Sequence, residues 1–211
     1  MLIPFSEILE KYKINPKGVI HVGANFGQEA KDYYDNGVEN VIWIEANPRS
    51  MDTLFYHLSS FPKQNPMLVL NECVSDKDDQ FVTFNISNNE GQSSSFLDLE
   101  YHKIAHAEVF YTEQIELKTK TLNTLFKDFD LSEFTFLNAD IQGAELLMLK
   151  GATEILPKID CLYLEVNEKE LYKGCGLIGE IDDFLKEFNF ERVQTEWCGN
   201  FGWGDALYLK R

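Results

Sequence analysis

Residues 18–47 constrain the fold of this chain most, because they combine two apolar strand patterns with a glycine turn. Val19, Ile20 and Val22 form a short apolar run rich in β-branched residues, which is typical of a buried parallel strand. The segment predicts a strand, a turn with Gly23 and Gly27, a helix over residues 26–36 and a second strand over 41–45. Such a strand-helix-strand unit is half of a nucleotide-binding fold.

An acidic residue stands at the end of this strand-helix-strand unit. Glu45 ends the second predicted strand, 18 residues beyond Gly27, near the ~20-residue offset of a carboxylate that binds ribose hydroxyls. The glycines are spaced G-x-x-x-G, and Asn25 fills the loop where a dinucleotide fingerprint has another glycine. This pattern favours S-adenosylmethionine, which has a ribose and no phosphate. The alternative is an ordinary strand-turn-helix with a surface glutamate.

The composition narrows the class of partner. With 19 basic and 35 acidic residues the formal charge is −16, which argues against nucleic acid and anionic membranes as partners. The length of 211 residues favours one domain over residues 1–211, with a helical cover at 1–17. Four scattered cysteines indicate reduced thiols, and no signal peptide or membrane span is seen, so we expect a cytoplasmic protein.

The middle of the chain predicts a third strand at 67–70 and a peripheral strand at 81–86. After the third strand, Ser75 or Asp76 is placed to bind adenine, although a solvated turn fits equally well. Residues 87–112 read as a lid or substrate insert, which begins polar and flexible and continues with aromatics, His102 and His106. Alternatively, the aromatic residues pack the insert against the rest of the protein, and the two histidines lie on the surface. The sequence gives still less support for metal binding by these histidines.

A second chemical centre follows the apolar strand over 134–139. Asp140 stands at its carboxyl end, where it could hold a ligand ammonium, orient an acceptor hydroxyl or take its proton. Glu145 could act similarly or complement a helix dipole, and Glu165 reaches the cleft from the next strand, over 159–166. The last strands, over 191–196 and 206–209, are joined by an aromatic hairpin, which is typical of a methyltransferase sheet.

These pieces resemble the FkbM-type S-adenosylmethionine-dependent methyltransferases. The resemblance rests on HVGANFG at 21–27, WIEANP at 43–48, NADIQGAE at 138–145, LKGA at 149–152 and the serine run at 93–95. It implies a class I methyltransferase fold: a Rossmann-like, doubly wound α/β sheet of seven strands, the last antiparallel, with an insert near 87–112. It also implies the cofactor S-adenosyl-L-methionine and methyl transfer, usually to oxygen.

The predicted site combines these motifs, and no metal ligand is assigned. The expected cofactor contacts are His21, Gly23, Ala24, Asn25, Gly27, Glu45, Ala46, Val74, Ser75 and Asp140. The candidate bases are Asp140 first, then His102 and His106. The family more often has Asp where this chain has His21, and Glu where it has Gln142. Glutamine at position 142 removes a charge, which argues against a role of this side chain as a base or a metal ligand.

The expected reaction is O-methylation of a hydroxyl on a sugar or small natural-product-like acceptor, by direct displacement with the reacting atoms aligned. Two other functions remain open. An NAD-dependent oxidoreductase would use a related sheet, but the missing glycine and the closing hairpin count against it. A non-catalytic cofactor-binding or protein-interaction module would keep the fold without the chemistry. The acceptor and the oligomeric state cannot be read from the sequence.

Overall fold

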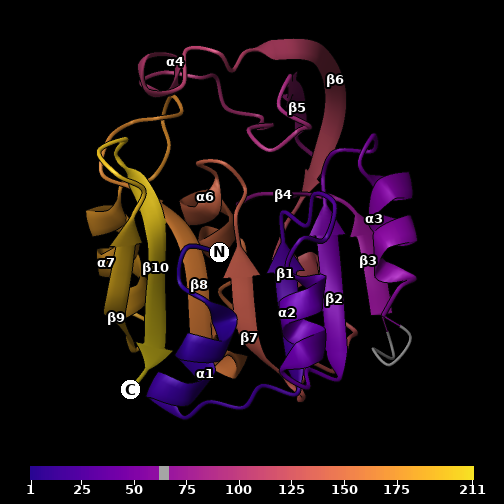
Figure 1. The fold of residues 1–211 in the computed structure, drawn as a ribbon, viewed down its shortest axis with the longest axis vertical. Helices are drawn as coiled ribbons and strands as arrows, with labels where there is room; N and C mark the ends of the chain where they lie inside the picture. Colours follow the sequence, from indigo (N-terminus) through magenta and orange to yellow (C-terminus); the bar gives the residue numbers. More distant parts are fainter. Residues whose placement is uncertain (62–66) are drawn as a thin grey trace.

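The computed structural model describes residues 1–61 and 67–211 and is built on a seven-stranded sheet (Figure 1). The strand order is β3-β2-β1-β7-β8-β10-β9. The strands are β1 (Gly18–Val22), β2 (Asn40–Glu45), β3 (Met67–Asn71), β7 (Phe134–Ala139), β8 (Cys161–Asn167), β9 (Phe190–Trp197) and β10 (Trp203–Lys210). Strands β3, β2, β1, β7 and β8 are mutually parallel, and β10 runs antiparallel to β8 and β9. The predicted seven-stranded sheet with an antiparallel last strand is confirmed.

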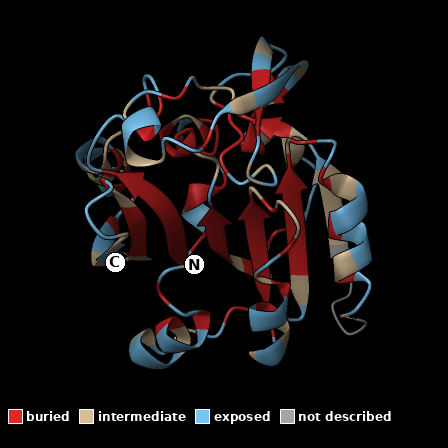
Figure 2. Cartoon of the chain, turned by 45° about the horizontal axis from the view of Figure 1, so that its top comes forward, coloured by how far each residue is buried: buried red, intermediate tan, exposed pale blue. Residues whose placement is uncertain are grey.

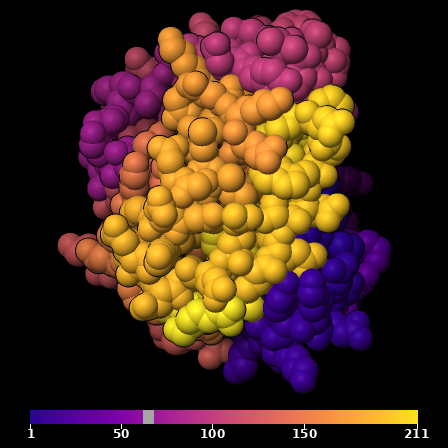
Figure 3. All heavy atoms as spheres, turned by 90° about the vertical axis from the view of Figure 1, so that its left-hand side faces the viewer, coloured from indigo at the N-terminus to yellow at the C-terminus, as the bar shows by residue number. Residues whose placement is uncertain are grey.

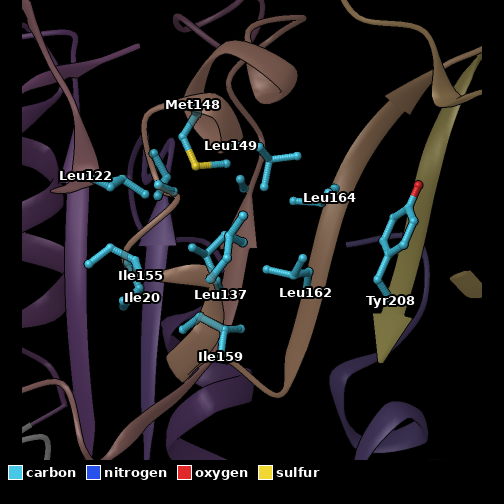
Figure 4. Close-up of a cluster of buried hydrophobic side chains, with 14 of the residues drawn as sticks. Ile20, Leu122, Leu137, Met148, Leu149, Ile155, Ile159, Leu162, Leu164 and Tyr208 are labelled. Atoms are coloured by element: carbon cyan, nitrogen blue, oxygen red, sulfur yellow. The ribbon is translucent and has the colours of Figure 1, made fainter. Parts of the chain in front are cut away.

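Helices cover both faces of this sheet. One face carries α1 (Phe5–Tyr12), α2 (Ala30–Asp35) and α3 (Met51–Leu58). The other carries α5 (Leu122–Leu125), α6 (Glu145–Lys150), the 3-10 turn η1 (Leu156–Lys158) and α7 (Ile178–Lys186). Alternate strand residues enter the two cores: Val19 packs with the first group, and Ile20 with the second (Figure 4). Burial on both faces is why these strands read as continuous apolar runs.

The strand register places three chemical positions at one edge of the sheet. Val22 of β1 pairs with Ile44 of β2 on one side and with Ala139 of β7 on the other. The residues that follow, Gly23 and Asp140, and Glu45 at the end of β2 therefore lie at the same carboxyl edge.

The helix after the glycine turn starts later than predicted. Residues 24–29 form turns, and α2 begins at Ala30 instead of Phe26. Asn25 and Gly27 have φ values of 42° and 76°, which an α-helix cannot contain. The predicted start of this helix at residue 26 is therefore wrong. The predicted N-terminal cover is a helix on one face, where Phe5 packs edge-on against Tyr33 and Phe136.

A second, three-stranded sheet lies beyond the carboxyl ends of the main strands (Figure 1). It contains β4 (Cys73–Val74), β5 (Phe81–Ser87) and β6 (Tyr111–Lys120), and the insert with α4 (His102–Ala105) connects β5 to β6. The backbone of the insert is tied to the segment after β8. Glu100 N donates to Leu171 O at 2.8 Å, and Lys173 N donates to Asp98 O at 2.8 Å. In the side view the insert packs directly on that segment (Figure 3).

The serine run at 93–95 does not form the flexible polar opening that its composition indicates. All three serines are buried. The central strands of the main sheet are buried as well (Figure 2). Ser93 N donates to Ser87 Oγ at 3.1 Å, and Ser87 N donates to Ser94 Oγ at 3.1 Å. Ser95 Oγ donates to the carbonyl of Gln142 at 2.9 Å, so the run joins the insert to the end of β7. Small polar side chains tolerate burial here because they bond to one another and to backbone.

Within the described residues, no helix has both the length and the apolar character needed to cross a membrane.

Candidate active site

A cavity of about 490 Å³ lies at the carboxyl edge of the sheet, between the main strands and the insert. This is where parallel α/β sheets bind ligands. Among the predicted site residues, those that line the cavity are His21, Gly23, Asn25, Glu45, Ala46, Val74, His102, His106 and Asp140. The structure thus brings together residues that lie as far as 119 positions apart in the chain.

Three predicted cofactor contacts lie outside the cavity lining. Ala24 is fully buried, and its N–H donates to Ile44 O at 3.0 Å. Gly27 packs on α3, where an added Cβ would lie 2.9 Å from Leu54 Cδ1. Ser75 N donates to Lys120 O at 2.9 Å, which places that residue in the small sheet.

Gly23 is required by the backbone of β7. Its φ is 87°, and an added Cβ would lie 1.8 Å from the carbonyl oxygen of Asp140. Its own N–H donates to Ile44 O at 2.8 Å, so the turn is bound to β2 as well. The glycine therefore permits the close approach of the Asp140 backbone.

Glu45 is held by two backbone donors. Asn25 N donates to one carboxylate oxygen at 2.7 Å, and Asn47 N donates to the other at 2.6 Å. The residue is 7% exposed, and this burial raises the pKa of Glu45 against the opposing effect of the two hydrogen bonds. A carboxylate has about four acceptor positions. Each oxygen therefore keeps an acceptor position for a ligand hydroxyl, and the residue fits a ribose diol.

His21 is a neutral part of the cavity floor. Its Nδ1 lies 2.9 Å from Tyr33 Oη, and Asn138 Nδ2 donates to the same hydroxyl at 2.8 Å. Burial lowers the pKa of His21 to about 4. The imidazole therefore carries no charge at neutral pH, and it connects β1 to α2 and β7.

Three carboxyl groups meet at the end of β7. Oxygens of Asp140, Glu145 and Glu165 all lie within 4.8 Å of one another. Asp140 is exposed and lines the cavity, whereas Glu145 and Glu165 are buried. Desolvation, followed by the charge of Asp205, raises the pKa of Asp140 to about 6. Burial raises the pKa of Glu145 to about 8 and holds that of Glu165 well above its ordinary value. At neutral pH the cluster therefore retains protons.

Within the described part of the chain, these three carboxyl groups are spaced closely enough to bind a divalent cation. Their lone pairs are already partly engaged. Ile141 N and Gly143 N donate to Glu145 Oε1 at 2.8 and 3.3 Å. Gln142 Nε2 donates to Asp140 at 2.6 Å and to Glu165 at 2.8 Å. An amide thus lies against both of the other two carboxyls.

The two histidines of the insert lie side by side, with ring centroids 5.0 Å apart. His106 Nε2 accepts a hydrogen bond from Trp203 Nε1 at 3.3 Å. His102 is 4% exposed, which is inconsistent with a surface role for it, and its Nδ1 has no hydrogen-bond partner. Burial, together with the neighbouring His106, lowers the pKa of His102 to about 4. A neutral, buried imidazole with a free nitrogen suits a hydrogen bond to an uncharged ligand group.

Sequence reasoning missed several wall residues. Tyr172, Trp203 and Asp205 line the cavity from the segment after β8 and from β10. The aromatic hairpin between the last strands was a signal for Trp203. No pattern in the sequence places Tyr172, because its position depends on the contact between the insert and the segment after β8.

Comparison with known proteins identifies the family of this chain. The model of the methyltransferase FkbM domain matches residues 21–192. The chain belongs to the FkbM methyltransferase family. It is similar to 2-O-methyltransferase NoeI of Sinorhizobium fredii, with 23% identity over 177 residues that cover 81% of this chain and 71% of NoeI. As a member of this family, the protein is a methyltransferase.

Solved structures of similar fold include two methyltransferases with bound ligands. Magnesium protoporphyrin IX methyltransferase from Synechocystis PCC 6803, with bound SAM, has a TM-score of 0.54 at 8% identity, over 96% of this chain and 74% of that one. TrmK of M. capricolum, in complex with S-adenosyl-homocysteine, has a TM-score of 0.55 at 6% identity, over 100% of this chain and 70% of that one. These likenesses show the class I Rossmann-like fold.

Proposed function

We propose that this methyltransferase uses S-adenosyl-L-methionine to methylate a hydroxyl of a small-molecule or glycan acceptor. The observation that carries the proposal is the pair of carboxylates flanking β1 at one cavity edge. Glu45 at the end of β2 binds the ribose diol, and Asp140 at the end of β7 faces the open part of the cavity. The resemblance to NoeI, named as a 2-O-methyltransferase, supports oxygen as the methylated atom.

The charge of the cavity supports an acceptor without phosphate groups. Seven acidic residues line it, and no lysine or arginine does among the described residues; the acids are Glu29, Glu45, Glu72, Glu108, Asp140, Glu165 and Asp205. A phosphate buried there would have no basic side chain to pair with. Aromatic wall residues such as Tyr172 and Trp203 offer apolar faces to a sugar or a phenol.

The chemistry asked of the protein is alignment and proton removal. Bound S-adenosylmethionine supplies a methyl group on a positively charged sulfur, which keeps the electron pair of the broken C–S bond when the methyl leaves. The cavity holds the acceptor oxygen in line with that bond. Asp140, ionised above its pKa of about 6, accepts the hydroxyl proton as the O–C bond forms. His102 hydrogen-bonds the acceptor from the opposite wall.

Binding and turnover test the proposal separately. Calorimetry with S-adenosylhomocysteine should show binding to the wild type, and Glu45→Ala should weaken it by about 10- to 100-fold through loss of charged hydrogen bonds. Glu39→Ala, an exposed site at the far end of β2, is the control. Methyl transfer is then assayed on sugars and phenols, with NAD⁺ titration as the comparison.

Binding of NAD⁺ in place of the homocysteine compound would refute the cofactor assignment. Cofactor binding without transfer to any acceptor would favour the non-catalytic module. Wild-type turnover in Asp140→Asn would remove Asp140 from the chemistry.

A further inference from the structure

Gln142 connects four parts of the cavity wall. Its Nε2 donates to Asp140 Oδ1 at 2.6 Å and to Glu165 Oε2 at 2.8 Å. Its Oε1 accepts a hydrogen bond from Tyr172 Oη, and its backbone carbonyl accepts one from Ser95 Oγ at 2.9 Å. The side chain of Gln142 thus bridges the end of β7, β8 and the segment after β8, and its backbone carbonyl binds the insert.

The chemistry of the partners fixes which way the amide faces. An ionised Asp140 only accepts hydrogen bonds, so the NH₂ group must face it, and Glu165 Oε2 accepts the second N–H. Burial holds the pKa of Tyr172 well above its ordinary value, so its hydroxyl stays protonated and donates to Oε1. Rotating the amide by half a turn would place its oxygen against the Asp140 carboxylate and its NH₂ group against the donating Tyr172 hydroxyl, so both of these bonds would be lost.

The backbone holds this side chain in place. Gln142 has φ of 56°, a left-handed conformation that is uncommon outside glycine. The next residue, Gly143, has φ of 94°, and an added Cβ there would lie 2.9 Å from the Tyr172 side chain. The absence of a side chain at Gly143 therefore lets Tyr172 pack against the bend, where its hydroxyl donates to the Gln142 amide.

We infer that Gln142 is a positioning residue that keeps Asp140 ionised and aimed into the cavity. The inference rests on the proposed role of Asp140 as base. A hydrogen bond to the charged form of a carboxyl favours that form. The titratable and charged groups around Asp140 come from several elements. The charges of Asp205 of β10 and Glu29 before α2 raise its pKa, whereas hydrogen bonds with Gln142 and Glu165 of β8 lower it. Glu145 of α6, Glu45 of β2 and the Met1 amine also interact with its charge. The neutral amide of Gln142 thus stabilises the ionised form of Asp140 without adding a charge among these acids.

The test is a ¹³C carboxyl NMR titration of Asp140 in the full chain, with the resonance assigned by comparison with Asp140→Asn. In the wild type the midpoint is expected near 6. Gln142→Leu should raise it by roughly one pH unit, and Gln142→Glu should raise it further, because a like charge replaces the amide. Tyr172→Phe frees the amide to rotate and should give a smaller rise. Gln80→Leu, at an exposed site, should leave the midpoint unchanged.

An unchanged midpoint in folded Gln142→Leu would overturn the inference. If Gln142→Leu does not fold, the Tyr172→Phe variant provides the test, because it keeps Gln142 and removes only the hydrogen bond from the Tyr172 hydroxyl. A wild-type titration midpoint for Asp140 in Tyr172→Phe would also overturn the inference. Calorimetry with S-adenosylhomocysteine on the same samples separates the two proposals. Loss of cofactor binding in the wild type would refute the proposed function, whereas the titration reports on Gln142 alone.

Discussion

Glu145→Gln should make the protein more resistant to alkaline unfolding. Glu145 is 1% exposed and lies within 4.8 Å of two other carboxyls. Burial raises its pKa from an ordinary 4.5 to about 8 in the folded protein. The folded state therefore binds this proton more tightly than the unfolded state. The resulting stability is fully present below pH 4.5 and is lost as the pH rises through 8.

The size of the effect follows from the two pKa values. Between them, each pH unit lowers the free energy of unfolding by about 1.4 kcal/mol. From pH 6 to pH 8 this amounts to roughly 2 kcal/mol, since the group begins to ionise near the upper limit. For a chain of this length that is a fall in melting temperature of about 4–8 °C. Glutamine keeps the carbonyl oxygen that accepts from Ile141 N and Gly143 N, and it cannot ionise.

Urea unfolding at pH 6, 7 and 8 measures this directly. We expect the wild type to lose stability over this range and Glu145→Gln to lose clearly less. Glu187→Gln, an exposed site after α7, should follow the wild type. A Glu145→Gln variant whose stability falls as steeply as that of the wild type would refute the argument, because Glu145 would then ionise without cost.

Three further predictions follow from the cavity wall. Gly23→Ala should destabilise the protein by about 3 kcal/mol or more, because its Cβ would meet the Asp140 carbonyl at 1.8 Å; denaturant unfolding checks this, with Gly179→Ala, which has open space around it, as control. Turnover should fall about tenfold per pH unit below 6 as Asp140 gains its proton, and Asp140→Asn should flatten this limb and cut the rate by about 10²- to 10⁴-fold. His102→Leu should raise the acceptor KM while thermal stability holds, since its Nδ1 has no partner to lose, and an unchanged KM would exclude His102 from acceptor binding.

The sequence was most informative where a pattern depends on local chemistry. The apolar runs around Ile20 and Leu137 identified central strands, because both faces of those strands are buried. The acid after the second strand was placed correctly at the cavity, since the end of a parallel strand fixes which edge it reaches. The family resemblance supplied the number of strands and the antiparallel last strand.

Features that depend on contacts between distant segments could not be predicted. The start of α2 moved to Ala30 because two residues of the turn take positive φ, which composition alone does not reveal. Ser93, Ser94 and Ser95 looked like solvent-exposed residues, but the partners that satisfy their hydroxyls come from β5 and from Gln142. The meeting of Asp140, Glu145 and Glu165 likewise required the pairing of β7 with β8.

The placement of β10 between β8 and β9 has a consequence for how the chain folds during synthesis. Strand β9 leaves the ribosome first, yet among the described residues its only partner in the sheet is β10, which follows it. Until Trp203–Lys210 is available, β8 presents an open edge and β9 has nothing to pair with. The nascent protein must therefore pass through a state with unpaired strand edges, which is the state most open to association with other chains.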